Sequence, residues 1–162
     1  MSRHSAREKS VMFLYQMEVR EQRDASLREV FYSQYPFKEE ADKTYFDFLI
    51  DGVTANRREL DNIIDKYLRG WTLERLSLID LAILRVAVLE LLFDSRVPVE
   101  IAISEAVILA DEYGDDRSRP FINAVLGNIE KNESPRVPRV DLSSDRADGG
   151  TLPDCVKHGE DA

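Results

Sequence analysis

The chain has 162 residues, of which 43% are hydrophobic and 33% are charged, and these values suit one globular domain with its own core. The net charge of −9 excludes a uniformly basic nucleic-acid coat, and a single cysteine, Cys155, excludes a disulfide framework and a cysteine-based zinc site. No run reaches the roughly 18 apolar residues of a membrane span, so we expect a soluble cytoplasmic protein.

The apolar residues are spaced as in helices up to about residue 132. This spacing predicts seven helices, over 3–23, 26–35, 38–54, 56–68, 78–93, 98–113 and from 119 or 120 to 132. In the helix over 78–93, thirteen of sixteen residues are apolar, which is typical of a helix buried on every side. The sequence therefore predicts an all-α domain of about seven helices around one hydrophobic central helix.

Two charged residues, Arg85 and Glu90, lie within this apolar central helix. Because an unpaired buried charge is costly, we expect each of them to find a partner in the core or at its edge.

The last thirty residues differ in composition from the rest. Residues 133–162 contain seven acidic and four basic residues, together with three of the six prolines and sparse apolar residues without a period. We therefore expect a folded domain over 1–132 and a disordered acidic tail over 133–162.

Few residues of the sequence suit catalysis. There is no glycine-rich phosphate loop and no HExxH or ExxH pair, and the two histidines, His4 and His158, are near the ends of the chain. Asp115 and Asp116 are adjacent, but without partners they are typical of solvated loop charges. We therefore expect no enzymatic activity, no cofactor and no metal site.

Two short basic segments are candidates for binding phosphate. Arg3 and Arg7 share one face of the first predicted helix, with His4 beside them, although a solvated first turn would look the same. Arg117 and Arg119 flank the predicted start of the last helix, where backbone N–H groups and guanidinium groups can bind an anion together. A plain charged loop is the alternative there.

Three stretches together resemble the NusB family of bacterial transcription antitermination factors. They are R-x-x-A-R-E-x-x-x-x-x-L-Y over 3–15, LRGWTLERLSLIDLAILRVAVLELL over 68–92 and VPVEIAISEAVILADEYGDDRSRPFINAVLGNI over 97–129. The resemblance covers residues 3–132. It implies two packed three-helix-bundle subdomains that bind the boxA RNA of ribosomal RNA leaders together with NusE, a ribosomal protein of the small subunit. The complex would join the elongating RNA polymerase with other Nus factors.

The resemblance also implies a set of RNA-binding residues, which supply guanidinium groups, aromatic rings and polar groups for reading unpaired bases. The set consists of Arg3, His4, Arg7, Tyr67, Asp80, Arg117, Arg119, Phe121 and Asn123. Three positions depart from the family pattern. Ser5 leaves fewer arginines in this segment than many family members have. Arg117 stands where an acid is common, and Ala124 replaces a glycine. Phe121 and Tyr67 could equally be core residues.

Two other functions remain as alternatives. A helical protein–protein adaptor without RNA binding would carry the same basic residues as plain surface. An RNA methyltransferase with a similar helical domain would need a cofactor-binding domain, and residues 133–162 leave no room for one. The RNA-binding hypothesis requires that the start of the chain and the region 115–123 lie on the same side of the molecule.

Overall fold

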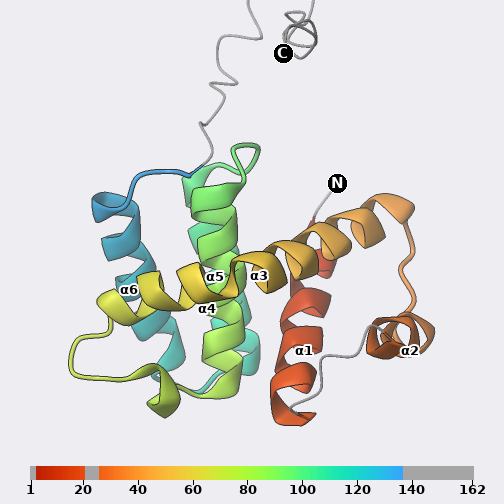
Figure 1. The fold of residues 1–162 in the computed structure, drawn as a ribbon, viewed down its shortest axis with the longest axis horizontal. Coiled ribbons are helices and arrows are strands. Elements are labelled where there is room, and N and C mark those ends of the chain that lie inside the picture. Colours follow the sequence, from red (N-terminus) through yellow and green to blue (C-terminus); the bar gives the residue numbers. More distant parts are fainter. Residues whose placement is uncertain (1–2, 21–25, 137–162) are drawn as a thin grey trace, which may run out of the picture.

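The computed structural model describes residues 3–20 and 26–136, and these residues form helices and connecting turns (Figure 1). The elements are α1 (His4–Arg20), α2 (Ser26–Gln34), α3 (Glu40–Lys66), the 3-10 turn η1 (Leu73–Arg75), α4 (Leu78–Phe93), α5 (Val99–Tyr113) and α6 (Ser118–Asn132). The prediction of an all-α fold is confirmed. None of the described helices combines the length and apolarity needed to cross a bilayer.

The helix α3 runs without a break through the point where the sequence predicted two helices. It has 27 residues, and Asn56 lies in its interior, where its side-chain amide donates to the carbonyl of Gly52 at 2.9 Å. Asn56 therefore does not cap a new helix, and Thr54–Asn56 contains no proline to interrupt the old one. The described part of the chain accordingly has six α-helices rather than seven.

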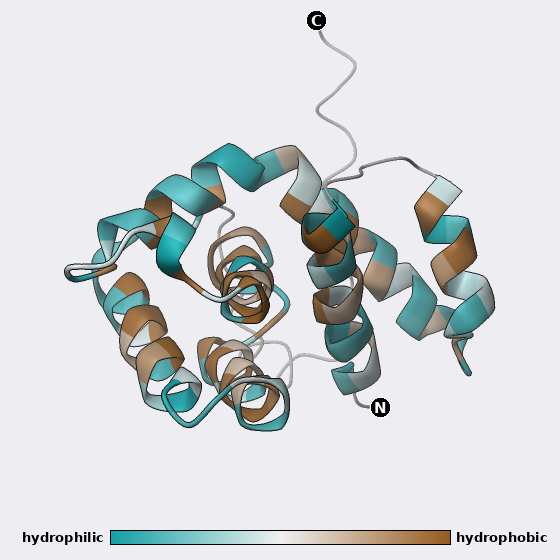
Figure 2. Ribbon diagram, turned by 90° about the horizontal axis from the view of Figure 1, so that it is seen from below, coloured by the Kyte–Doolittle hydropathy of each residue, from teal (hydrophilic) through white to brown (hydrophobic). Residues whose placement is uncertain are grey.

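The central position of α4 is confirmed. Every residue from Leu81 to Leu92 is buried, and α4 packs against α1, α3, α5 and α6. Ser77 caps the helix by accepting the N–H of Asp80 at 3.1 Å. In Figure 2 the hydrophobic residues gather on the inner faces of the helices and the hydrophilic residues on the outer faces.

Two groups of helices share the long helix α3. The helices α4, α5 and α6 pack against one another on one side, and α1 and α2 lie on the other, with α3 crossing both groups (Figure 1). Aromatic rings fix α2, because Phe31 stacks on Phe46 of α3 at 5.4 Å and meets Phe13 of α1 edge-on at 5.2 Å. This arrangement agrees with the two subdomains that the family resemblance implied.

Arg85 and Glu90, two of the three charged residues of α4, have partners, as predicted, whereas the third, Asp80, lies in the first turn of the helix. Arg85 forms two hydrogen bonds to the carboxylate of Asp61, at 2.8 and 2.9 Å, and a third to Glu18 at 2.8 Å. Glu90 accepts from Arg7 and from the hydroxyl of Tyr45. Arg85 and Glu90 therefore link the apolar helix α4 to α1 and α3 through ion pairs and hydrogen bonds.

The segment after α6 is attached to the body beyond the boundary predicted at residue 132. The N–H of Arg136 donates to the carbonyl of Leu92 at 2.7 Å, and its guanidinium group binds Glu59 at 2.9 Å. Residues 133–136 therefore belong to the folded unit. The rest of the predicted tail, 137–162, lies outside the described residues.

Gly52 marks a close approach between α3 and α4. A Cβ atom at this position would lie 2.7 Å from a terminal methyl of Leu89, whose side chain is buried in the core. In α6, by contrast, a Cβ at Gly127 would meet no atom within 4 Å. Alanine substitutions at the two glycines therefore distinguish the cost of a steric clash from the gain in helix propensity.

We expect Gly52→Ala to lower the free energy of unfolding by about 1–2 kcal/mol. Overpacking costs roughly 1–3 kcal/mol and exceeds the gain of about 1 kcal/mol from replacing a helical glycine. Gly127→Ala is the matched control and should raise the free energy by roughly 0.5–1 kcal/mol. Urea unfolding followed by circular dichroism measures both. A Gly52→Ala protein as stable as the Gly127→Ala protein would contradict the close approach.

Candidate nucleic-acid interface

Arg3 lies at the start of α1, beside the turn between α4 and α5. Its guanidinium carbon is 4.3 Å above the centre of the Tyr45 ring. Arg96 lies in the same area. Its exposed guanidinium group is 5.1 Å from the centre of the Phe48 ring and binds Asp94 at 3.0 Å. These two arginines border one hollow with Val97 and Pro98. The sequence analysis missed Arg96, although it lies next to the V-P motif.

Arg7 is not available for RNA, and the prediction of an RNA contact is corrected here. Its Nε lies 2.9 Å from both carboxylate oxygens of Glu90, and the two side chains are 5% and 1% exposed. Ala6 and Ser10, its neighbours on the inner face of α1, are also buried. Burial lowers the pKa of Arg7, but the hydrogen bond and charge of Glu90 outweigh this, so the pKa is raised and the guanidinium stays charged.

His4 is near Arg3 but is surrounded by carboxylates. Its Nδ1 lies 2.7 Å from Glu105 of α5, and its Nε2 lies 3.4 Å from Glu8 and 3.9 Å from Glu112. The hydrogen bond to Glu105 raises the pKa of His4, and the charges of all three glutamates add to this effect. Three carboxylates repel an RNA phosphate, so the site that was predicted for His4 is electrostatically unfavourable to RNA.

The loop before α6 is ordered by Asp115 and Ser118. The N–H of Asp115 donates to the Ser118 hydroxyl at 3.0 Å, and the N–H of Arg117 donates to the Asp115 carboxylate at 2.8 Å. Asp115 is therefore an exposed loop charge, as predicted, that also caps the turn before α6. A Cβ at Gly114 would lie 2.3 Å from the Ser118 hydroxyl, so only glycine fits this turn.

The two arginines of this loop remain on the surface. Arg119 binds Asp111 of α5 at 2.7 Å, and both side chains are exposed. Arg117 is also exposed. Because Asp115 occupies the N–H of Arg117, the expected anion site on the helix N-terminus is partly filled by the protein itself. The guanidinium groups of Arg117 and Arg119 are therefore the groups of this loop that can contact a phosphate.

The remaining predicted residues divide into packed and exposed groups. Phe121 and Tyr67 pack against the core, and the Tyr67 hydroxyl donates to Glu133 at 2.5 Å. This bond, with one from Lys66, lowers the pKa of Glu133 to about 2. Asn123 is exposed. Tyr67 and Phe121 are therefore half-buried residues that pack against the core, which agrees with the alternative interpretation of the sequence.

Asp80 follows Ile79, which lines a groove that contains exposed aromatic side chains. The groove is lined by residues of α1, the start of α4 and the end of α5, namely Met12, Tyr15, Gln16, Ser77, Leu78, Ile79 and Tyr113. The rings of Tyr15 and Tyr113 are 40% and 41% exposed. One carboxylate oxygen of Asp80 is buried and has no hydrogen-bond partner among the described residues. The sequence analysis quoted Tyr15 in a motif but did not select it, although Tyr15 lies off the apolar stripe of its helix.

The start of the chain and the loop 114–119 lie at the two ends of one seam between α1 and α5. Arg3 borders a hollow with Pro98 and Ile101 at the start of α5, and Tyr15 shares the groove with Tyr113 at its end. The length of α5, about 22 Å, separates the two regions. Arg3 and Tyr113 therefore lie at opposite ends of one extended edge and do not form a compact cradle.

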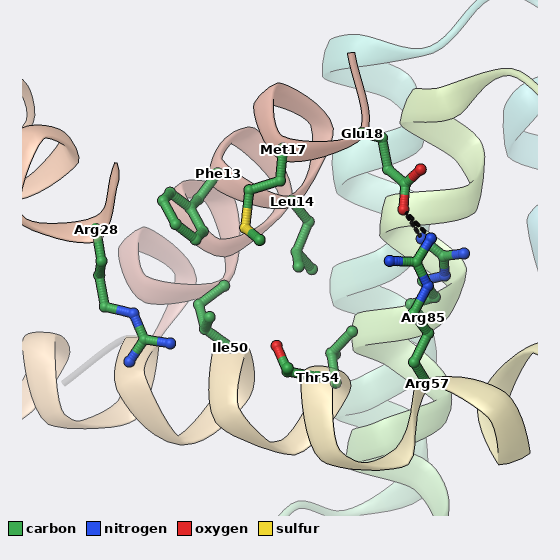
Figure 3. A pocket seen from close by; sticks show the side chains of 10 residues that line it. Phe13, Leu14, Met17, Glu18, Arg28, Ile50, Thr54, Arg57 and Arg85 are labelled. Carbon is green, nitrogen blue, oxygen red and sulfur yellow. Dashed lines mark hydrogen bonds and ion pairs between the residues drawn. The ribbon is translucent and has the colours of Figure 1, made fainter. Parts of the chain in front are cut away.

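A separate, more enclosed pocket lies between α1, α2, α3 and α4 (Figure 3). Its volume is about 180 Å³, and its walls are mainly apolar side chains such as Phe13, Met17 and Ile50. Arg57 and Arg85 at its edge both bind Glu18. Because Glu18 and Asp61 together balance the charge of these two guanidinium groups, the pocket is less suited to an anion than the exposed arginines of the surface.

The fold and the seam define a helical binding module with aromatic and guanidinium groups along one edge. The NusB family model matches residues 4–131, and the chain belongs to the NusB family. The transcription antitermination protein NusB of Bacillus subtilis is 36% identical over 132 residues, which are 82% of this chain and 97% of that protein. The NusB of Clostridium tetani is 50% identical over 93 residues, 57% of this chain and 61% of that protein.

Solved structures agree with this assignment. NusB from T. maritima superimposes with a TM-score of 0.75 and 32% identity, covering 84% of this chain and 95% of that one. A structure of the antitermination factors NusB and NusE in complex with dsRNA gives a TM-score of 0.73 and 27% identity, covering 81% and 98% of the two chains.

Proposed function

We propose that the chain is an RNA-binding transcription antitermination factor that acts with NusE. The observation that supports the proposal is the match, over 81% of this chain, to a NusB chain solved in complex with NusE and dsRNA. We further propose that the RNA is the boxA element of ribosomal RNA leaders and that the assembly joins the elongating RNA polymerase with other Nus factors. The protein then acts in the cytoplasm by binding and not by catalysis.

The two ends of the α1–α5 seam supply groups that single-stranded RNA requires, whereas the glutamates around His4 on the same seam are unfavourable to phosphate. Tyr15 and Tyr113 offer partly exposed side chains on which bases can stack. Asp80 is half-buried with one oxygen buried, and its other carboxylate oxygen is the proposed acceptor for base edges. Arg3 and Arg117 at the two ends supply positive charge for phosphates. Arg119, Arg96 and Asn123 are further exposed groups near these ends.

The charge of the whole chain argues for selectivity. A net charge of −9 repels RNA in general, so binding depends on the few arginines along the seam. With so few phosphates neutralised, the salt dependence should be modest, at roughly −0.7 per phosphate on a logarithmic scale.

A protein partner has a suitable surface on the same helix. Ile101 and Ile108 of α5 are 45% and 40% exposed and lie on one face. This surface also favours the alternative function, a protein–protein adaptor without RNA binding. The two functions are distinguished by measuring RNA binding directly, with and without NusE.

We expect a boxA-like RNA of about a dozen nucleotides to bind the chain weakly and to bind more tightly when NusE is present. Tyr15→Ala should weaken this binding roughly tenfold, since stacking on an aromatic ring is worth about 1–3 kcal/mol per base. Arg117→Ala should reduce the salt slope by about 0.7. Fluorescence anisotropy of labelled RNA measures all three effects.

Lys43→Ala, on α3 beside Tyr32 and away from the seam, is the matched control and should leave the affinity unchanged. A scrambled RNA that binds equally well with and without NusE would favour the adaptor. Unchanged affinity in both Tyr15→Ala and Arg117→Ala would place the RNA elsewhere.

A further inference from the structure

A cluster of four ionisable side chains joins the start of α1 to α5. His4 and Glu8 are one helical turn apart on α1, and Glu105 and Glu112 are two turns apart on α5. The Nε2 of His4 and one carboxylate oxygen each from Glu8 and Glu112 all lie within 4.8 Å of one another. The proposed RNA function does not use this cluster, because three carboxylates are unfavourable to a phosphate.

The spacing of these atoms is close to that of a coordination shell. A tetrahedral zinc ion with bonds of about 2.0–2.2 Å holds its ligand atoms roughly 3.4 Å apart. In the structure the Nε2 of His4 is 3.4 Å from Glu8 and 3.9 Å from Glu112. Small rotations of the two glutamate side chains, which are 33% and 44% exposed, would bring both oxygens to bonding distance of one ion.

Glu105 holds the His4 ring from its other side. Its carboxylate lies 2.7 Å from the other ring nitrogen of His4, Nδ1, so this nitrogen donates the hydrogen bond. A histidine that binds a metal commonly donates its second N–H to a carboxylate in this way, which orients the ring and increases the basicity of the ligating nitrogen. The Nε2 atom therefore faces Glu8 and Glu112 with its orientation already fixed.

We propose that His4, Glu8 and Glu112 bind a divalent transition-metal ion, with Zn²⁺ as the best match, and that Glu105 orients His4. One imidazole and two carboxylates are ligands that zinc accepts, whereas Mg²⁺ and Ca²⁺ prefer oxygen ligands alone. Three protein ligands at a partly exposed position leave the fourth to water. The ion would offset the charge of the carboxylates and tie the first turns of α1 to α5, next to Arg3.

The sequence analysis did not find this site because its ligands come from two distant segments. His4 and Glu8 form only an H-x-x-x-E pair, and Glu112 lies more than a hundred residues away along the chain. No short motif contains all three residues, and only the packing of α1 beside α5 brings them together.

Zinc titration in competition with a chromophoric chelator at pH 7.5 tests the proposal. The parent for this experiment carries Cys155→Ser and His158→Ala, which remove the single cysteine and the second histidine of the chain. We expect one zinc ion per chain, and binding weakened by more than about 100-fold in His4→Ala. Glu105→Gln should weaken binding by about 10- to 100-fold, as expected for a residue that orients a ligand.

Glu112→Gln is the second ligand variant and should weaken zinc binding at least about tenfold, again by the loss of a coordinating group. Glu100→Gln, an exposed residue of the same helix, is the matched control and should bind zinc like the parent. Far-UV circular dichroism checks that each variant is folded. Absence of stoichiometric zinc in the parent, or parent-like affinity in both His4→Ala and Glu112→Gln, would overturn the proposal.

Discussion

Arg7→Ala should lower the free energy of unfolding by about 3–5 kcal/mol, because it leaves the carboxylate of Glu90 buried without its cation. Both side chains are almost fully buried, and the guanidinium Nε lies 2.9 Å from each oxygen of Glu90. The hydroxyl of Tyr45 also donates to this carboxylate, at 2.5 Å, but a neutral donor cannot replace the lost charge. Urea unfolding monitored at 222 nm measures the loss.

A second substitution distinguishes the buried charge from other effects. In the double variant Arg7→Ala/Glu90→Gln the amide carries no charge and can still accept from Tyr45, so part of the stability should return. Arg3→Ala, one turn earlier on the same helix, should cost no more than about 1 kcal/mol, the value of its contact with the Tyr45 ring. An Arg7→Ala protein that keeps its stability and loses only RNA affinity would restore Arg7 as an RNA-binding residue.

Arg85→Ala should be the second most damaging change, with a loss of about 2–3 kcal/mol in the free energy of unfolding. The Arg85 side chain is 5% exposed and links α4 to α1 and α3 through Glu18 and Asp61. These carboxylates are 21% and 22% exposed, so water can partly solvate them, and the expected loss is smaller than for Arg7.

Arg57→Ala is the matched control for Arg85. Arg57 also binds Glu18, as Figure 3 shows, but its side chain is 28% exposed. Exposed ion pairs are worth at most about 1 kcal/mol. The melting temperature should therefore fall clearly for Arg85→Ala and little for Arg57→Ala, while both keep their RNA affinity. Equal losses in the two variants would show that burial does not set the strength of this network.

The sequence predicted the fold better than it predicted the contacts within it. The apolar run over 78–93 was enough to identify the central helix, since burial on every side leaves no polar face. The continuity of α3 was missed because the sequence has no signal that distinguishes one helix over 40–66 from two helices that meet near residue 55. Local patterns determine which residues are helical, but the ends of helices depend on particular hydrogen bonds.

The candidate site shows the same limit more strongly. Arg3 and Arg7 are indistinguishable as sequence, yet one lies at the surface and the other is paired with Glu90, which is 83 residues further along the chain. Tyr15 became a candidate only when the groove with Tyr113 was known. Packing between helices determines whether an arginine or tyrosine side chain is buried or exposed. A single sequence therefore cannot assign these roles.

The length of α3 has a consequence for how the protein could be divided. This helix spans about 40 Å and forms a wall of both helix groups. A cut in the chain between the groups would deprive one half of its longest hydrophobic contact surface and expose Leu60 and Ile64, or Phe46 and Leu49, to water. The NusB-like body is therefore a single inseparable module, and fragments of it are poor substitutes for the whole in any reconstitution of the transcription complex.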